Sequence, residues 1–209
     1  MIRNRLAELL FERDIKIVRM SKEIGISRNT ITNTASNNSE MLQMNTINKI
    51  CSYLKITPCE FFDYIPLDIE FSFFEDQSID IVAGWNLSLI ECQINLDIDL
   101  LLDIESEGKN YKIDTKLIPS TNIILNMTPA ENNIALTIDS DEKQLNTLKE
   151  IFKDIPKEFK KVIYNNLISE YKKFIAKNID LDETVEGNTK RDLINTLNFT
   201  LTNDFIKYY

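Results

Sequence analysis

Apolar residues recur at helical spacing through the first sixty residues of the chain. The spacing of Ile2, Leu6, Leu9 and Leu10 predicts a helix over about residues 2–13. Similar signals predict four more short helices, over residues 17–24, 27–36 and about 45–54, and from residue 57 to Pro66.

The last two of these helices have recognisable starts. Asn45 is the expected cap of the fourth helix, and the apolar face of that helix holds Ile47, Ile50, Cys51 and Leu54. The segment Thr57-Pro58-Cys59-Glu60 combines a capping box with a proline at the first helical position.

A glycine between the second and third helices predicts a tight turn. Gly25 can adopt the positive φ that ends one helix, and Ser27 is a good N-cap for the next. The small Ser21, four residues before Gly25, would let the two helices approach each other. Apolar residues flank the turn and line the following helix: Ile24, Ile26 and Ile31. Together these features predict a helix-turn-helix.

After residue 66 the apolar period changes from helical to alternating. We expect strands at residues 69–74, 79–83, 94–104, 111–118, 122–127 and 134–139, with short turns such as 107–110 between them. Helices are expected from Leu145, from Pro156 and, through Leu193, Ile194, Leu197 and Leu201, near residue 200. Strands followed by helices predict an α+β domain with a mostly antiparallel sheet.

Charge divides the chain at the same place. The chain carries 24 Lys+Arg against 33 Asp+Glu, a net charge of −9. Nine basic and seven acidic residues give residues 1–66 a charge of +2, so residues 67–209 carry −11. A basic face can meet phosphates, whereas an acidic module is repelled by them. We therefore expect two domains, residues 1–66 and 67–209, with different partners.

The first module resembles the Cro/CI-type (Xre-like) helix-turn-helix regulators. Residues 20–31 (MSKEIGISRNTI) carry the resemblance, which continues through residues 46–51 and 54–58. The chain departs from the family at two places, with Ile17 where a phosphate-binding Gln is common and Ala35-Ser36-Asn37 in place of a Glu-x-Gly. Asn37 can adopt the left-handed conformation of that glycine. The resemblance implies an all-α five-helix DNA-binding domain.

The resemblance also implies how the third helix would read DNA. Its N-terminal residues would lie in the major groove, with Arg28 placed for guanine and Asn29 or Asn33 for adenine. The methyl groups of Thr30 and Thr32 would meet thymine methyl groups. An ordinary solvated helix face is the alternative for each of these polar residues.

Phosphate contacts would come from the second helix and its start, through Lys16, Arg19 and Lys22. The complete set expected at double-stranded DNA is Lys16, Arg19, Lys22, Ser27, Arg28, Asn29, Thr30, Thr32, Asn33, Asn37 and Asn38. Because a charge of +2 is modest, we expect a dimer to be needed for useful affinity.

Two patterns in the second half suggest chemistry. Ala83-Gly84 resembles the scissile dipeptide of self-cleaving repressors, but no Gly-x-Ser-Met stretch follows it. Asp114-Thr115-Lys116, behind Asp97, Asp99 or Asp103, has the spacing of metal-dependent nucleases, whose carboxylates bind Mg²⁺. Alternating aspartates are also typical of the wet face of a half-exposed sheet. We expect that second interpretation, with no catalytic residue, metal site or cofactor.

The amino-acid composition excludes several classes of mechanism and of cellular location. The chain has no histidine, which excludes every mechanism that needs imidazole. Its three cysteines lack a C-x-x-C spacing and fit buried thiols in a reducing cytosol. We see no signal peptide and no apolar stretch long enough to cross a bilayer, so we expect a cytoplasmic protein that does not enter membranes.

The sequence thus favours a DNA-binding transcriptional regulator. Its resemblance to the Cro/CI-type regulators implies a repressor of a phage or another mobile element, which we expect to bind a palindromic operator as a dimer. The acidic half would dimerise or receive a signal. A different class stays open: an autoregulated antitoxin or anti-CRISPR-type antagonist, whose acidic half would inhibit a protein partner by charge mimicry.

Overall fold

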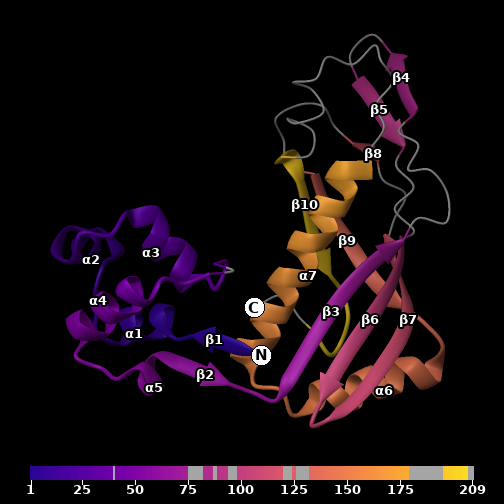
Figure 1. Ribbon diagram of the computed structural model, residues 1–209. Helices are drawn as coiled ribbons and strands as arrows, with labels where there is room; N and C mark the ends of the chain where they lie inside the picture. The colour runs from indigo at the N-terminus through magenta and orange to yellow at the C-terminus, as the bar shows by residue number, and fades with distance from the viewer. Residues whose placement is uncertain are drawn as a thin grey trace. The chain divides into compact units, whose positions relative to one another are not determined.

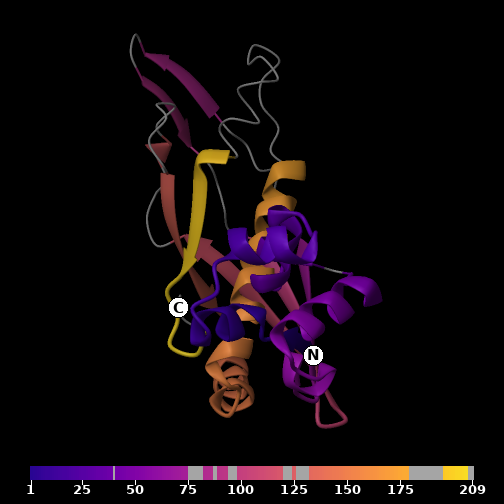
Figure 2. The same ribbon diagram turned by 90° about the vertical axis from the view of Figure 1, so that its left-hand side faces the viewer.

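The computed structural model describes residues 1–39, 41–74, 82–86, 89–93, 98–119, 124–125, 132–178 and 195–206. The chain forms two compact units, Met1–Leu67 and Asp68–Tyr209, seen from two sides in Figures 1 and 2.

The first unit places helices between two short strands. Its elements are β1 (Ile2–Asn4), α1 (Leu6–Glu12), α2 (Ile17–Ile24), α3 (Arg28–Ala35), α4 (Met44–Leu54), α5 (Pro58–Phe61) and β2 (Phe62–Tyr64). The helices α2, α3 and α4 lie where the apolar spacing predicts them. The cap of α4 is Gln43, so the prediction of Asn45 was off by two positions.

The two ends of this unit differ from the expected all-α fold. Residues 2–4 form a strand instead of the first turn of a helix, and α5 is a single turn of four residues. The capping box of Thr57 and Glu60 is present, but Phe62 has an extended backbone and leaves the helix. The two ends pair as antiparallel strands, with Ile2 opposite Tyr64. This pairing gives hydrogen-bond partners to backbone groups that single helical turns would leave without them.

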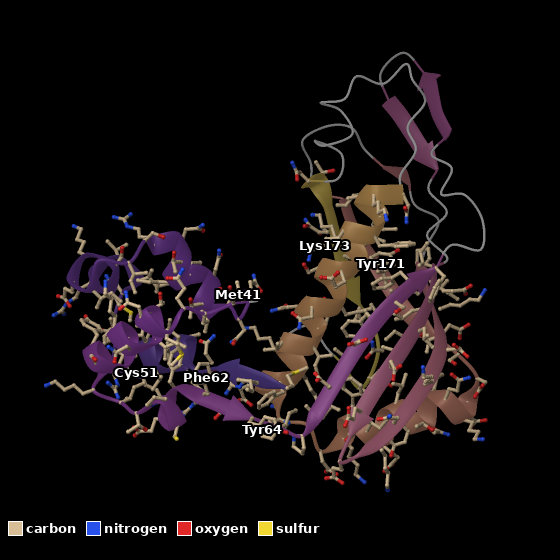
Figure 3. The ribbon with its side chains drawn as sticks, viewed as in Figure 1. Met41, Cys51, Phe62, Tyr64, Tyr171 and Lys173 are labelled. Atoms are coloured by element: carbon tan, nitrogen blue, oxygen red, sulfur yellow. The ribbon has the colours of Figure 1, made fainter. Side chains whose placement is uncertain are left out.

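One apolar core holds the first unit together. Leu6, Met20, Ile31, Ile50 and Phe61 are all fully buried within it. They come from all five helices, so burial of one face of each helix stabilises the arrangement. Figure 3 shows Cys51 in this unit, and Met41 and Tyr64 are exposed apolar side chains of the same unit.

The described part of the second unit has two sheets, together with the helices α6 and α7. Its elements are β3 (Leu67–Phe74), β4 (Val82–Asn86), β5 (Leu89–Gln93), β6 (Ile98–Ser106), β7 (Lys109–Pro119), β8 (Ile124–Leu125), β9 (Asn132–Asp139), α6 (Glu142–Lys153), α7 (Lys157–Asn178) and β10 (Leu197–Leu201). The larger sheet has the order β10-β9-β7-β6-β3, and the smaller has the order β4-β5-β8.

The hairpin of β6 and β7 shows how the alternating pattern produces the sheet. Its turn consists of Glu107 and Gly108, both with positive φ (52° and 76°), as a type I′ hairpin turn requires. In β6, Leu100 and Leu102 are buried, whereas Asp99 and Asp103 lie on the other face. The predicted turn and the predicted wet face are therefore confirmed.

Of two expectations for the second unit, the mostly antiparallel sheet is met only in part and the last helix is wrong over residues 197–201. The larger sheet is mixed, because β10 runs parallel to β9 while β7 is antiparallel to both β6 and β9. The segment with Leu197 and Leu201 is a strand, not a last helix. Four residues apart, these two leucines fit either period, but buried Phe199 lies midway between them and marks the period of two.

Helix α7 lies along one face of the larger sheet (Figure 1). Tyr171 of α7, labelled in Figure 3, is fully buried, and its ring lies 4.9 Å from Phe199 and 5.7 Å from Phe73. Phe205 packs 5.6 Å from Phe152. The aromatic residues Phe73 and Phe205 therefore contribute to the packing of this unit.

Candidate nucleic-acid interface

The turn between α2 and α3 has the geometry that the sequence predicts. Gly25 adopts the left-handed conformation (φ 67°), and its N–H donates to the carbonyl of Ser21 at 3.1 Å. The Ser21 hydroxyl bonds to the Ile26 carbonyl, while Ile24 and Ile26 pack against the core. The angle between the two helices is thus fixed by hydrogen bonds and by apolar contacts.

Ser27 caps the start of α3. Its Oγ accepts a 3.0 Å hydrogen bond from the Thr30 N–H and lies 2.8 Å from the Thr30 hydroxyl. These bonds satisfy an otherwise open backbone donor of the first turn. Two of the residues expected at DNA, Ser27 and Thr30, therefore also build the helix start.

Four of the expected base-reading residues share the outer face of α3. Ile31 and Thr34 turn inward and are fully buried. At 3.6 residues per turn, the opposite side carries exposed polar side chains, and these are Arg28, Asn29, Thr32 and Asn33. A helix of this kind offers one cation, two amides and one hydroxyl to a groove.

The three expected phosphate-binding residues lie on or just before α2, and all are exposed. Lys16 and Lys22 have no partner among the described residues. Arg19 differs, because its Nε donates to Glu23 at 3.0 Å. The Tyr53 hydroxyl and then Arg19 lower the pKa of Glu23, and Glu23 raises the pKa of Arg19. Glu23 thus balances part of the Arg19 charge within the protein. Glu23 was not predicted from the sequence as a partner of Arg19.

Asn37 and Asn38 follow α3 but differ in their surroundings. Asn37 has the left-handed backbone predicted for it (φ 57°), and its amide group is hydrogen-bonded to Asn4. Its side chain therefore joins the end of α3 to β1. Asn38 is exposed. Asn4 was not predicted, because no local pattern links residues 33 positions apart.

Other cations of the first unit are committed to the fold. Arg3 is buried and bonds to Glu8 (2.7 Å) and Asp63 (2.5 Å). Arg13 donates to the Leu54 carbonyl. Five cations of the first unit have no hydrogen-bond or ion-pair partner among the described residues: Lys16, Lys22 and Arg28 lie at the helix-turn-helix, and Lys49 and Lys55 lie on and directly after α4.

The nuclease-like pattern forms cross-strand ion pairs. Lys116 lies opposite Asp99 and pairs with it at 3.2 Å, and Lys112 pairs with Asp103 at 3.1 Å. Asp97 lies outside the described residues. Among the described residues, no three Cys, Asp or Glu side chains are arranged to hold a metal ion. The pattern is thus accounted for by pairing on the wet face of the sheet.

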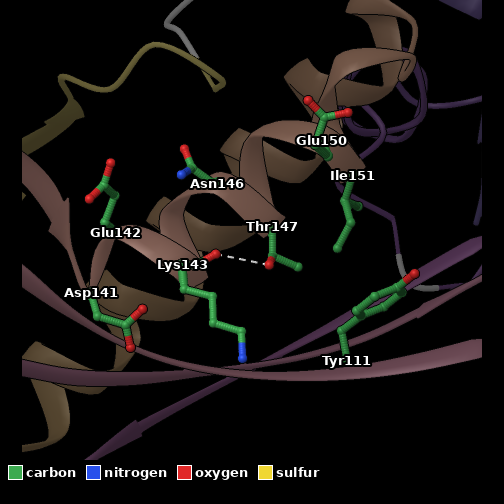
Figure 4. A pocket seen from close by; sticks show the side chains of 8 residues that line it. All are labelled: Tyr111, Asp141, Glu142, Lys143, Asn146, Thr147, Glu150 and Ile151. Atoms are coloured by element: carbon green, nitrogen blue, oxygen red, sulfur yellow. Dashed lines mark hydrogen bonds between the residues drawn. The ribbon is translucent and has the colours of Figure 1, made fainter.

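The scissile-like dipeptide Ala83-Gly84 lies in β4, within a regular antiparallel ladder with β5. A separate open hollow lies between α6 and β7 (Figure 4). It is lined by Tyr111, Asp141, Glu142, Lys143, Asn146, Thr147, Glu150 and Ile151, and the Thr147 hydroxyl bonds to the Lys143 carbonyl. Tyr111 belongs to β7, Asp141 is the cap of α6, and the other lining side chains lie on α6.

No described helix combines the length and apolar character needed to cross a membrane. Neither the curated proteins nor the solved structures contain a match to this chain. Residues 5–66 match the family model of the Cro/C1-type HTH DNA-binding domain. The turn at Gly25, the cap at Ser27 and the polar outer face of α3 all lie within that segment. The first unit therefore carries a Cro/C1-type helix-turn-helix DNA-binding domain.

Proposed function

We propose that the chain is a sequence-specific transcriptional regulator, a cytoplasmic repressor of a phage or another mobile element. Residues 1–66 bind double-stranded DNA, and residues 67–209 dimerise or receive a signal. The match of residues 5–66 to a DNA-binding family supports this proposal. The protein works without a metal, a cofactor or a catalytic step.

One observation carries the proposal: the outer face of α3 is entirely polar and begins directly after a fixed turn. Arg28 suits the O6 and N7 atoms of guanine, and Asn29 and Asn33 suit adenine. Thr32 can meet a thymine methyl group. Lys16 and Lys22 lie at α2, where they suit phosphates and set the register. Arg19, Ser27, Thr30 and Asn38 are placed at the edge of this interface, whereas Asn37 is assigned a structural role.

The proposal includes a homodimer. An eight-residue helix and three unpaired cations offer few contacts, so one copy would bind weakly. A two-fold dimer doubles the phosphate contacts and places two recognition helices about 34 Å apart on one side of the duplex. Such a dimer reads a palindromic operator.

Fluorescence anisotropy with the full-length chain tests the proposal. The duplex upstream of its own gene is compared with a scrambled duplex of the same length and composition. We expect the upstream duplex to bind at least about a thousandfold more tightly, the usual margin of specific sites. The upstream region is also tested as promoter-sized fragments. If every fragment bound only as tightly as its scrambled duplex, sequence-specific regulation would be refuted.

A second candidate function rests on the outer face of the larger sheet. This face carries exposed carboxylates that two lysines, Lys112 and Lys116, only partly balance; they are Asp68, Glu70, Glu105, Asp114 and Asp139. An acidic face of this kind suits a basic nucleic-acid-binding protein, as an antitoxin or anti-CRISPR-type antagonist would require.

A matched pair of proteins separates the two functions. The full-length chain and its Glu105→Lys/Asp114→Lys/Asp139→Lys variant are used as bait in the host lysate. The antagonist interpretation expects one basic protein that the natural chain retains in high yield and the variant loses. DNA affinity, measured in parallel, should rise slightly in the variant because the net charge becomes less negative.

A further inference from the structure

A buried polar network joins the end of the recognition helix to the first strand. Asn37, just after α3, accepts hydrogen bonds at its Oδ1 from the backbone N–H of Asn4 (2.7 Å) and from the Asn4 side-chain amide (2.8 Å). The Asn37 Nδ2 returns a bond of 3.0 Å to the Asn4 carbonyl. The two asparagines thus form a reciprocal pair between segments far apart in the sequence.

The same network reaches into α3 and α1. The Asn4 amide also donates to the carbonyl of Thr34 (2.7 Å), and its Oδ1 accepts from the N–H of Leu6 (3.1 Å). The Thr34 hydroxyl bonds back to the Thr30 carbonyl at 2.8 Å. One side chain, Asn4, therefore contacts the start of α1, the last turn of α3 and the residue that follows it.

Because this network is largely buried, losing any of its hydrogen bonds would cost free energy. Asn4 is 4% exposed and Thr34 is fully buried. A buried polar group without a partner is costly, so an alternative orientation of α3 that broke these bonds would be strongly disfavoured. Apolar contacts alone tolerate small rotations of a helix, whereas a set of directional bonds does not.

The recognition helix is short and is held at both ends. Ser21 and Ser27 fix its start through the bonds to Ile26 and Thr30, and the Asn4–Asn37 pair fixes its end. Base reading by Arg28 and Asn33 requires hydrogen-bond geometry, so a small tilt of α3 would impair it more than it would impair phosphate binding.

We propose that Asn4 and Asn37 are positioning residues for base recognition: they fix the orientation of α3 without touching DNA. This inference rests on the proposed DNA-binding function. It assigns Asn37 a role in specificity that acts through the fold.

The decisive variant is Asn37→Gly in the full-length chain. Glycine accepts the left-handed conformation, so the variant removes the amide group without adding backbone strain. Lys55→Gly is the matched control, because Lys55 is also a left-handed residue (φ 52°) but ends α4. Both variants are compared with the natural chain at a temperature where circular dichroism shows each to be fully folded.

The first measurement is the ratio of affinities for the operator and for scrambled DNA. We expect Asn37→Gly to lower this ratio about tenfold, within the range that one bidentate contact provides, with affinity for scrambled DNA unchanged. Lys55→Gly should leave the ratio unchanged. A folded Asn37→Gly protein with the natural ratio, or with equal losses on both duplexes, would overturn the inference.

The second measurement does not depend on DNA. Amide hydrogen exchange should become about tenfold faster in α3 of Asn37→Gly, with α4 unchanged. Unchanged exchange in α3 would also overturn the inference. If the natural chain binds no duplex, the proposed function fails, and the exchange result still decides whether the network holds α3. Should Asn37→Gly not fold, Asn37→Asp replaces the bond donated to the Asn4 carbonyl by a repulsive contact between two oxygen atoms, and the exchange rate of α3 in that variant decides the inference.

Discussion

The Ser21 hydroxyl donates a 2.6 Å hydrogen bond to the carbonyl oxygen of Ile26, across the turn that separates α2 from α3. Residue 21 must be small for the helices to approach, and a serine additionally satisfies a carbonyl that the turn leaves open. The bond links the last turn of one helix to the residue before the cap of the next.

Replacing Ser21 with Ala tests this bond. The smaller side chain keeps the helix contact, so only the hydrogen bond is lost, and we expect about 1 kcal/mol less stability. Urea denaturation followed by circular dichroism measures the change. Ser52→Ala, at an exposed site on α4, is the control for the higher helix propensity of alanine and should not lower the stability. Equal stability of Ser21→Ala and the natural chain would show that the bond contributes nothing.

Gly25→Ala should destabilise the first unit by about 1 kcal/mol, because a Cβ is disfavoured at positive φ. The cost is confined to the backbone, since a Cβ at Gly25 would meet no atom within 4 Å. Gly25→Asn should cost less, because asparagine tolerates this conformation better. Thermal unfolding of the three proteins gives the order. If the asparagine variant were the least stable, side-chain crowding would have to be the cause.

Arg28→Ala should weaken binding to the operator by about 1–3 kcal/mol and barely alter binding to scrambled DNA. The reason is that a guanidinium on the outer face of α3 reads a base edge and not the backbone. Titration of both duplexes at one salt concentration measures the two affinities. Equal losses on both would mean that Arg28 touches only phosphate.

Lys22→Ala should weaken binding to all sequences alike and should reduce the slope of log affinity against log salt by about 1. Lys49→Ala, an exposed lysine on α4, is the control and should leave the slope unchanged. Anisotropy titrations over a series of salt concentrations give the slopes. A slope that does not change for Lys22→Ala would place this lysine away from the DNA.

The capping box of α5 should make stability depend on pH. The backbone N–H of Thr57, followed by its hydroxyl, lowers the pKa of Glu60 below its ordinary value of about 4.5. The ionised carboxylate is therefore favoured in the folded state, and its contribution is complete above that value and lost as the pH falls through the lowered pKa. Glu60→Ala should thus be less stable than the natural chain near pH 7, and the difference should shrink as the pH falls below 4.5 and through the lowered pKa of Glu60. A difference that persists at low pH would exclude the carboxylate as its source.

Local signals made the helix-turn-helix predictable from the sequence. Gly25 and Ser27 define the turn and the cap through their own backbone preferences, and Ile31 marks the inner face of α3 by its spacing. The same applies to the β6–β7 hairpin, where alternation and a Glu-Gly turn lie within a few residues of each other.

The parts that could not be predicted depend on distant partners. Residues Ile2–Asn4 become a strand because residues 62–64 pair with them, and Asn4 finds Asn37 and Thr34 only after folding. The strand β10 follows from its neighbour β9, since the positions of Leu197 and Leu201 alone suit a helix equally well. No local pattern encodes such pairings.

The pairing of β10 with β9 also has a consequence for synthesis on the ribosome. The first unit holds all of its secondary structure by residue 64, so it can fold while translation continues. The larger sheet of the second unit is incomplete until Leu197–Leu201 has been synthesised, because β10 is its edge strand and Phe199 packs against Tyr171. A nascent chain halted between residues 140 and 190 would therefore present a finished helix-turn-helix beside an incomplete partner domain.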